Sequence, residues 1–253
     1  MSVENSENQS MQPQYRTQRP DYPHEIVGFI KGYCQPDKSW QIADIGSGAG
    51  VSTNFLSWGL KIAVFAVEPD DKLRSMAEQN EEANPYFHSV KGTAENTALP
   101  DNSVNLVCAF EAFQWFDKSK ARVEFRRILR SPGYVLIAFS EKATDKCGFT
   151  KDYETLLSTF PEYQTAMHPT PTLDEIKVFL NNEYIMTEVF FVNLELDWDG
   201  LMDRFISAFY TPQKGSPQHD RSILQLREAY NKHARMDRIE LSYKFTGYLG
   251  EVV

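Results

Sequence analysis

The sequence has few cysteines and no long apolar run. Its three cysteines, Cys34, Cys108 and Cys147, are widely separated and odd in number, so their spacing suits neither a disulfide framework nor a zinc site. No apolar run approaches the roughly 20 residues that a membrane-spanning helix needs, and the polar N-terminus lacks the pattern of a signal peptide. We therefore expect free thiols in a reducing compartment, no metal, no membrane partner and a cytoplasmic location.

Basic residues are also scarce. The chain carries 26 Lys and Arg against 35 Asp and Glu, for a formal net charge of −9. A protein that held nucleic acid through its phosphates would be expected to be basic, so we expect no nucleic-acid partner. Apolar residues, in contrast, make up 42% of the chain and aromatic residues 13%, which is enough for a packed core. A length of 253 residues predicts one large domain or a domain with a sizeable cap.

The chain changes composition at two points. Residues 1–14 are mostly Ser, Asn, Gln and Glu with almost nothing to bury, which predicts a disordered tail. Residues 15–253 are expected to form a single domain. Its first part, up to residue 140, alternates apolar runs with helix-compatible stretches, which predicts an α/β fold with a doubly wound parallel sheet. Residues 141–253 do not continue this alternation of strands and helices, and the stretch up to about residue 172 is predicted to be loop-rich.

Apolar periodicity and turn residues predict the individual elements. Strands are predicted at residues 41–45, 62–67, 86–90, 104–110, 134–139, 189–196 and 239–245. Helices are predicted at residues 51–58, from Pro69, after Asp117, at 173–180, at 201–210 and at 221–233. The 104–110 run is almost continuously apolar, which is typical of a central parallel strand buried on both faces. Thr172 and Glu175 have the spacing of a capping box.

The most informative stretch is a glycine-rich turn that follows an apolar strand. Asp44 precedes Gly46, Gly48 and Gly50, and a second apolar run ends in Glu68. This pattern is half of a nucleotide-binding βαβ unit, in which the turn touches the ligand and an acid binds the ribose. The third glycine comes one residue early for a dinucleotide fingerprint, so a ligand without a pyrophosphate is favoured, and Asp44 suits a cationic amine. The alternatives are a plain tight turn with a surface acid and a nucleotide-dependent oxidoreductase.

Four motifs stand in order along the chain, at residues 44–50, 67–70, 92–100 and 112–116. With them the chain resembles a class I S-adenosylmethionine-dependent methyltransferase of the type 11 group, close to the trans-aconitate methyltransferase-like branch. The resemblance implies a Rossmann-like, mostly parallel seven-stranded sheet with a helical insertion and an antiparallel last strand. It implies S-adenosyl-L-methionine as cofactor and S-adenosyl-L-homocysteine as product.

The resemblance also divides the domain by role. Residues 15–140 would be the cofactor-binding core. Residues 141–253 would supply a substrate-cap insertion, the C-terminal helices and the last strands. The resemblance is detailed over about residues 15–140 and extends to the later helices and final strand only in layout.

Cofactor-binding residues follow from the matching positions. The resemblance implies Arg19, Tyr22, Asp44, Gly46, Ser47, Gly48, Gly50, Glu68, Pro69, Ala94, Glu95, Phe110 and Glu111. Asp44 would lie near the amino group of the methionine part, and Glu68 would bind the ribose hydroxyls. Pro69 would flank the adenine, and Ala94 and Glu95 would meet its edge.

The remaining positions surround the reacting end of the cofactor. Phe110 and Glu111 would line the floor near the reactive methyl. Arg19 and Tyr22 match an approach segment that would fold over the methionine carboxylate. Asn105 stands where relatives often carry Asp, at a position that usually serves structure.

The substrate and the catalytic residues are less defined. Methyl transfer from a sulfonium already has an activated leaving group, so the protein mainly supplies alignment and a dry pocket. A carboxylate acceptor needs no base, and Gln114 stands where relatives often carry His, so the catalytic residues stay unknown. The candidate substrate contacts are Gln114, Trp115, Phe116, His168, Arg204 and Tyr210. Arg204 could pair with an acidic acceptor; the alternative is that the aromatic residues are core and Arg204 is solvated.

We therefore predict an enzyme that transfers a methyl group to a small molecule, at a carboxylate or a hydroxyl, and acts as a monomer or homodimer. One alternative is a non-catalytic S-adenosylmethionine-binding regulatory protein. The other is the oxidoreductase, which the early third glycine disfavours.

Overall fold

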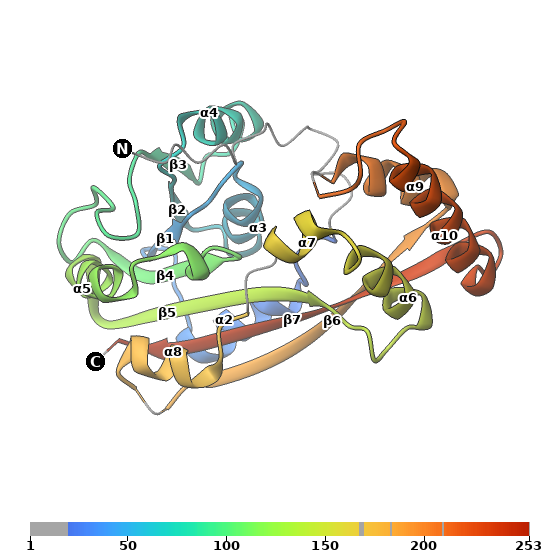
Figure 1. Cartoon of the computed structure of the whole chain (residues 1–253). Helices are drawn as coiled ribbons and strands as arrows, with labels where there is room; N and C mark the ends of the chain where they lie inside the picture. Colours follow the sequence, from blue (N-terminus) through green and yellow to red (C-terminus); the bar gives the residue numbers. More distant parts are fainter. Residues whose placement is uncertain (1–19, 167–169, 183, 209, 253) are drawn as a thin grey trace. The chain divides into compact units, whose positions relative to one another are not determined.

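The structure is a computed structural model that describes residues 20–166, 170–182, 184–208 and 210–252 (Figure 1). The predicted tail, Arg19 and His168 lie outside the described residues.

The chain divides into two compact units. The sheet unit consists of Tyr22–Ser140, Pro169–Phe190 and Phe245–Val253. The helical unit consists mainly of Glu141–His168 and Phe191–Lys244. The sheet unit contains all of the described residues that the sequence assigns to the cofactor. It is therefore where a cofactor site has to be sought.

Seven strands form one sheet in the order β3-β2-β1-β4-β5-β7-β6. They are β1 Gln41–Ile45, β2 Ala63–Val67, β3 Phe87–Val90, β4 Val104–Phe110, β5 Leu129–Lys142, β6 Met186–Leu196 and β7 Ile239–Glu251. The first five pair in parallel. Strand β7 runs antiparallel to β5. The Val252 amide donates to the Gly133 carbonyl, and the Ala143 amide donates to the Ser242 carbonyl. The predicted fold class is confirmed.

Strand order reverses next to β1. The chain first moves outward from β1 to β2 and β3, and then returns to place β4 on the other side of β1. Ile42 of β1 therefore pairs with Val64 on one side and Leu106 on the other. In doubly wound sheets, ligands bind at the carboxyl ends of the strands where this reversal occurs. The glycine turn after β1 lies at this position.

The central strands are buried on both faces, as predicted for residues 104–110. Successive side chains of a strand point to opposite faces. Val107 and Ala109 of β4 accordingly belong to one apolar cluster and Leu106 and Cys108 to another. The first cluster includes residues of helices α5 Lys118–Ile128 and α8 Leu173–Leu180, and the second those of α2 Glu25–Cys34 and α3 Val51–Leu60. Helices thus cover both faces of the sheet around the turn.

The predicted helix caps are mostly confirmed. The Asp117 side chain accepts from the Lys120 amide at the start of α5. Thr172 and Glu175 form the predicted capping box. The placement of Pro69 at a first helical position is wrong, because α4 Asp71–Asn80 begins two residues later. Asp70 caps α4 by accepting from the Lys72 and Leu73 amides.

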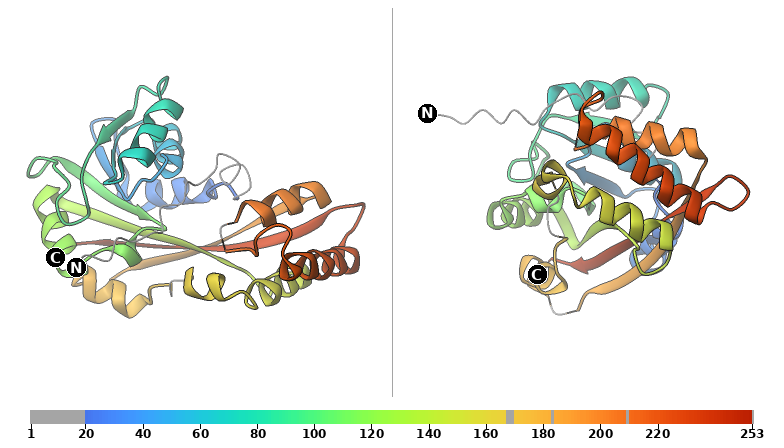
Figure 2. Two further views of the ribbon diagram at one scale, coloured as in Figure 1. Left: turned by 45° about the horizontal axis from the view of Figure 1, so that its top comes forward. Right: turned by 45° about the vertical axis from the view of Figure 1, so that its right-hand side comes forward.

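Element limits in the second half of the chain were predicted less well. The helical unit contains α6 Gly148–Leu157, α7 Pro161–Ala166, α9 Trp198–Ser207 and α10 Pro217–His233. The prediction of a loop-rich stretch from 141 to 172 is therefore wrong. Helix α10 lies beside α9 and α6 (Figure 2). It packs on α9 through Trp198 and Tyr230 and on α6 through His233, whose Nε2 lies 2.8 Å from Asp152 Oδ2. No described helix is long and apolar enough to span a membrane.

Candidate active site

The turn after β1 is built from glycine backbone conformations. Gly46, Gly48 and Gly50 have φ angles of 71°, 55° and 87°, a region that residues with a Cβ rarely adopt. A Cβ at Gly46 would lie 2.7 Å from Ala112 Cβ, whereas a Cβ at Gly48 would have no atom within 4 Å. Gly46 is thus required by close packing against the segment after β4. Gly48 faces open space, where a ligand could approach the backbone.

Asp44 lies beneath the turn and is fully buried. Its Oδ2 accepts hydrogen bonds from Ser52 Oγ and Thr53 Oγ1, both at 2.6 Å, so it ties β1 to the start of α3. Its Oδ1 and the hydroxyl of Ser47 are buried without a hydrogen-bond partner among the described residues. Burial raises the pKa of Asp44 to about 6, because the two hydroxyls only partly replace the lost hydration.

Glu68 follows β2 and reaches across to the turn. Its Oε2 accepts from the Gly48 amide and its Oε1 from the Asp70 amide, both at 2.9 Å. Burial raises the pKa of Glu68, an effect that the two amides oppose. A carboxylate oxygen can accept more than one hydrogen bond, so each oxygen retains capacity for a further donor. Pro69, next in the chain, is exposed.

The end of β4 forms the other side of the strand reversal. Phe110 is buried, and Glu111 adopts a left-handed conformation with φ 54°. The Ser140 amide donates to Glu111 Oε1 at 2.5 Å, and the Gln114 side chain donates to the Glu111 carbonyl at 2.9 Å. A left-handed conformation at a residue with a Cβ costs energy, and such residues are frequent at functional sites. Surrounding hydrogen bonds hold Glu111 in this conformation beside the turn.

The loop of residues 93–101 is fixed by a network that the sequence did not reveal. Glu124 of α5 accepts from the Thr97 amide at 2.7 Å and the Thr97 hydroxyl at 2.6 Å. Arg127 forms a bidentate pair with Glu124 and donates to the Leu99 carbonyl. The Arg127 guanidinium lowers the pKa of Glu124 to about 2. The network holds buried Ala94 and half-buried Glu95 close to α5, where Glu95 Oε1 accepts from the Asp117 amide.

Of the two residues that the resemblance assigns to the approach segment, Arg19 and Tyr22, the structure describes Tyr22. Its ring packs against Phe110 with a centroid distance of 4.8 Å, against Phe55 at 5.4 Å and against Phe245 at 5.9 Å. Tyr22 therefore lies over the carboxyl end of β4, next to the predicted floor of the site.

The substrate candidates divide between the two units. In the sheet unit, Gln114 is held by Glu111, Phe116 packs against the core, and Trp115 is 61% exposed. In the helical unit, Arg204 donates to the Tyr243 hydroxyl, and the Tyr210 ring lies 4.8 Å from that of Tyr163.

The helical unit also contains a polar cluster that sequence reasoning missed. Lys142 Nζ lies 2.7 Å from the Tyr163 hydroxyl and 2.9 Å from Glu154. The Tyr163 hydroxyl donates to Glu154. Burial, followed by the Glu154 carboxylate, raises the pKa of Tyr163 well above its usual range. Tyr163 is therefore a neutral hydroxyl at physiological pH. Its long separation from Lys142 in sequence gave no signal for the pairing.

Asn105 has the structural role that was expected of it. Its side-chain oxygen accepts from the Gln41 amide and from Arg130, both at 3.0 Å, which links β1, β4 and β5. Among the described residues no group of three or more potential metal ligands comes together.

Residues 43–137 match the sequence model of a family described as a methyltransferase domain. An uncharacterized methyltransferase of Mycobacterium tuberculosis is 29% identical over 139 residues, which are 54% of this chain and 53% of that protein. An uncharacterized methyltransferase of Schizosaccharomyces pombe is 27% identical over 126 residues, which are 50% of this chain and 49% of that protein. The chain thus spans about half the length of the curated relatives it matches.

Solved structures agree on the fold. The YcgJ protein of Bacillus subtilis superposes with a TM-score of 0.56 at 19% identity, covering 90% of this chain and 98% of that one. A geranyl diphosphate methyltransferase in complex with GPP and sinefungin gives a TM-score of 0.50 at 11% identity, covering 90% of this chain and 78% of that one. Residues 43–137 are thus similar to a methyltransferase domain, and the named relatives that share this region are methyltransferases by name.

Proposed function

We propose that this protein transfers a methyl group from S-adenosyl-L-methionine to a small-molecule acceptor, at a carboxylate or a hydroxyl group. The observation that carries the proposal is the arrangement at the strand reversal. There the open backbone face of Gly48 and the carboxylate of Glu68 lie side by side, joined by the hydrogen bond from the Gly48 amide.

The residues present fit the cofactor. The turn leaves space above Gly48, where an added Cβ would meet nothing within 4 Å. Ser47 Oγ has no hydrogen-bond partner among the described residues, as expected of a polar group that a ligand would satisfy. Glu68 retains acceptor capacity for ribose hydroxyls, and Ala94 with Glu95 would meet the adenine edge. Because Asp44 is fully buried and bonded to α3, we assign it a role in shaping the turn.

The protein's contribution to catalysis would be alignment and exclusion of water. The cofactor, when bound, supplies a methyl group on an activated leaving group. Phe110 and Tyr22 form an apolar wall at the end of β4, which lowers the local dielectric constant. Holding two reactants in line removes much of the entropic barrier to their reaction. A carboxylate acceptor has no proton to lose, so Gln114, which is not a base, is compatible with this step.

An acidic acceptor, as in the trans-aconitate methyltransferase-like branch, is the finer part of the proposal. Arg204 supplies a guanidinium and Tyr243 a hydroxyl, in contact with each other within the helical unit. A guanidinium binds a carboxylate with two parallel hydrogen bonds.

Calorimetric titration tests the proposal. S-adenosylmethionine and S-adenosylhomocysteine should bind with micromolar dissociation constants, and NADH should not bind. Glu68→Ala should weaken both sulfur ligands by a factor of ten or more, about 1.4 kcal/mol. Glu82→Ala, at an exposed acid after α4, is the matched control and should bind as the wild type does. Absence of binding by either sulfur ligand would contradict the proposal.

If the cofactor binds, transfer itself can be measured. Small carboxylic acids and phenols would be offered as acceptors together with methyl-labelled S-adenosylmethionine. Labelled product from at least one acceptor is expected. Cofactor binding without transfer to any acceptor would favour the regulatory alternative.

A further inference from the structure

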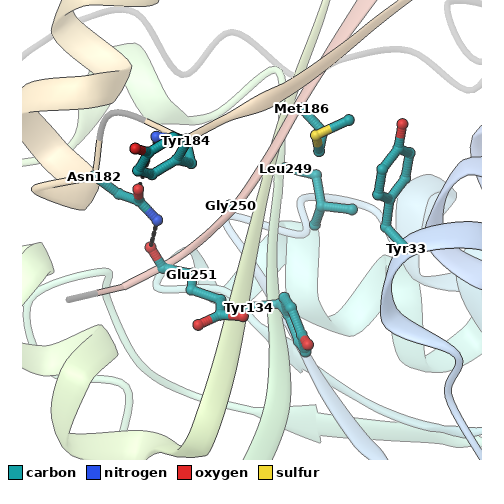
Figure 3. A pocket seen from close by; sticks show the side chains of 8 residues that line it. All are labelled: Tyr33, Tyr134, Asn182, Tyr184, Met186, Leu249, Gly250 and Glu251. Carbon is teal, nitrogen blue, oxygen red and sulfur yellow. Dashed lines mark hydrogen bonds between the residues drawn. The ribbon is translucent and has the colours of Figure 1, made fainter.

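A pocket lies within the sheet unit, away from the glycine turn. It has a volume of about 450 Å³ and is lined by Tyr33, Tyr134, Asn182, Tyr184, Met186, Leu249, Gly250 and Glu251 (Figure 3). Tyr134 pairs with Leu106, and Leu106 with Ile42, near the amino ends of these strands. Gly46 is four residues further along, roughly 13 Å at 3.3 Å per residue. The pocket is therefore at the opposite end of the strands from the proposed cofactor site.

The walls of this pocket are held in place by the fold. Asn182 Nδ2 donates to the Glu251 carbonyl at 3.1 Å, and the Tyr184 amide donates to Asn182 Oδ1 at 2.8 Å (Figure 3). A Cβ at Gly250 would lie 3.1 Å from Leu180 Cδ1 and 3.7 Å from the Tyr184 carbonyl. The segment that carries Tyr184 thus lies directly against β7. Its backbone contacts define the pocket independently of any ligand.

Two of the three tyrosine rings also pack against other aromatic rings. Tyr134 stacks on Trp40 with a centroid distance of 5.9 Å and an interplanar angle of 16°. Tyr33 packs edge-on against Phe29 at 5.2 Å. Tyr33 is nevertheless 44% exposed, and Tyr184 is 89% exposed. The rings are large apolar surfaces that the core does not use fully.

The charge of the pocket has one sign. Glu251 is the only acidic side chain among the eight lining residues, and none of them is Lys, Arg or His. No ion pair to the Glu251 carboxylate occurs among the described residues. Its negative charge acts on the pocket, because it adds to burial in raising the pKa of Tyr134. The pocket therefore combines aromatic rings, a polarizable thioether and one uncompensated carboxylate.

We infer that this pocket binds a small organic cation of the alkylammonium class, with the tyrosine rings around its methyl or methylene groups and Glu251 facing its charge. An ammonium group is attracted to the faces of aromatic rings. The pocket volume of about 450 Å³ lies within the range of small-molecule sites. An anionic ligand would meet the Glu251 carboxylate with no Lys, Arg or His among the lining residues to balance the two negative charges.

A charge-matched pair of probes tests this inference. Choline carries a trimethylammonium group, and 3,3-dimethyl-1-butanol is its uncharged isostere of nearly the same shape. Calorimetry and saturation-transfer NMR on the full chain should detect choline binding and much weaker binding of the alcohol. Equal binding of the two would show a merely apolar pocket and would overturn the inference.

Variants locate the site. Glu251→Gln and Tyr33→Leu should each weaken choline binding about three- to fivefold, as expected for one charge or ring at a partly exposed site. Glu82→Gln should have no effect. Binding of S-adenosylmethionine should be unchanged in both pocket variants, so the result stands or fails apart from the proposed function. Choline binding that is unaltered in both variants would place the cation elsewhere and would contradict the inference.

The cation could be free or part of a lipid headgroup. Phosphatidylcholine vesicles therefore form a second arm of the experiment, read out by sedimentation. Binding of free choline without sedimentation on vesicles is the expected result. Sedimentation without binding of free choline would overturn the assignment to a small soluble ligand.

Discussion

The turn at Gly46–Gly50 and the loop at residues 93–101 both border the proposed cofactor site, yet they are held by different means. The turn depends on backbone conformations open to glycine and on Asp44, a buried carboxylate whose described partners are hydroxyls. The loop depends on Glu124, a buried carboxylate that Arg127 neutralises. The pKa of Asp44 is accordingly raised to about 6 and that of Glu124 is lowered to about 2.

The comparison shows two ways in which the conformation of a segment is fixed: by its own residues, or by contacts with another element. An adjacent cation offsets the cost of burying a carboxylate. Glu124 and Arg127, here called the clamp, form such a pair. The turn has no such cation among the described contacts of Asp44, so its shape comes from local backbone preference. The loop has little local preference and takes its shape from α5. Substitutions in the turn and in the loop network should therefore change the free energy of unfolding in different ways.

The largest expected effect is at Gly46. Gly46→Ala places a Cβ 2.7 Å from Ala112 Cβ and also forces a side chain into a left-handed conformation. The expected loss in the free energy of unfolding is about 3–5 kcal/mol, from strain together with overpacking. Gly48→Ala, with the same type of conformation but open space, should lose only about 1–2 kcal/mol. Urea denaturation followed by circular dichroism measures both; similar losses would contradict the packing argument.

A pH series should separate the two carboxylates. Because the pKa of Asp44 is raised in the folded state, the native protein binds more protons than the unfolded chain between about pH 4 and 6. Its contribution to stability therefore falls as pH rises through that window. From pH 4 to pH 7, the free energy of unfolding of Asp44→Asn should therefore rise by about 3 kcal/mol relative to that of the wild type.

Glu124→Gln is the matched comparison. The pKa of Glu124 is lowered, so its contribution is fully present above about pH 4.5 and is lost as pH falls toward 2. The stability difference between Glu124→Gln and the wild type should therefore be constant from pH 5 to 7. A difference that changed over this range, or one for Asp44→Asn that did not, would show that the assignment of the two charges is wrong.

A smaller effect is expected at the cation of the clamp. Arg127→Met should lower the free energy of unfolding by about 2 kcal/mol, because it leaves the buried Glu124 without its cation, although partial exposure of Arg127 moderates the cost. Arg126→Met, at an exposed neighbour, should change it by less than about 0.5 kcal/mol. Equal losses in the two variants would indicate that the clamp does not stabilise the loop.

The same contrast explains what could be predicted from the sequence. The turn was predictable because Asp44, three glycines and Glu68 are local signals whose chemistry is specific. The clamp was not, because 27 residues separate Thr97 from Glu124 and nothing in either segment marks the pairing. The pairing of Tyr163 with Lys142, 21 residues away in the chain, was missed for the same reason.

Errors in element limits have local physical causes. The strand predicted at residues 134–139 begins earlier in the structure, because β5 starts at Leu129 and continues through Pro132 and Gly133. Pro69 suggested a helix start, but Asp70 is a better cap because its side chain can accept from the helix amides. In the stretch after residue 141, the buried residues Phe149, Tyr153, Leu156 and Leu157 of α6 have helical spacing, a signal that the prediction of loops overlooked.

Hydrogen exchange with and without S-adenosylmethionine tests most directly whether the turn and the loop form one cofactor site. Saturating cofactor should slow exchange in peptides covering residues 46–50 and in those covering residues 93–97. Exchange in peptides covering residues 184–186, which border the tyrosine-lined pocket, should not change. Slower exchange in only one of the two regions, or in neither, would contradict the account.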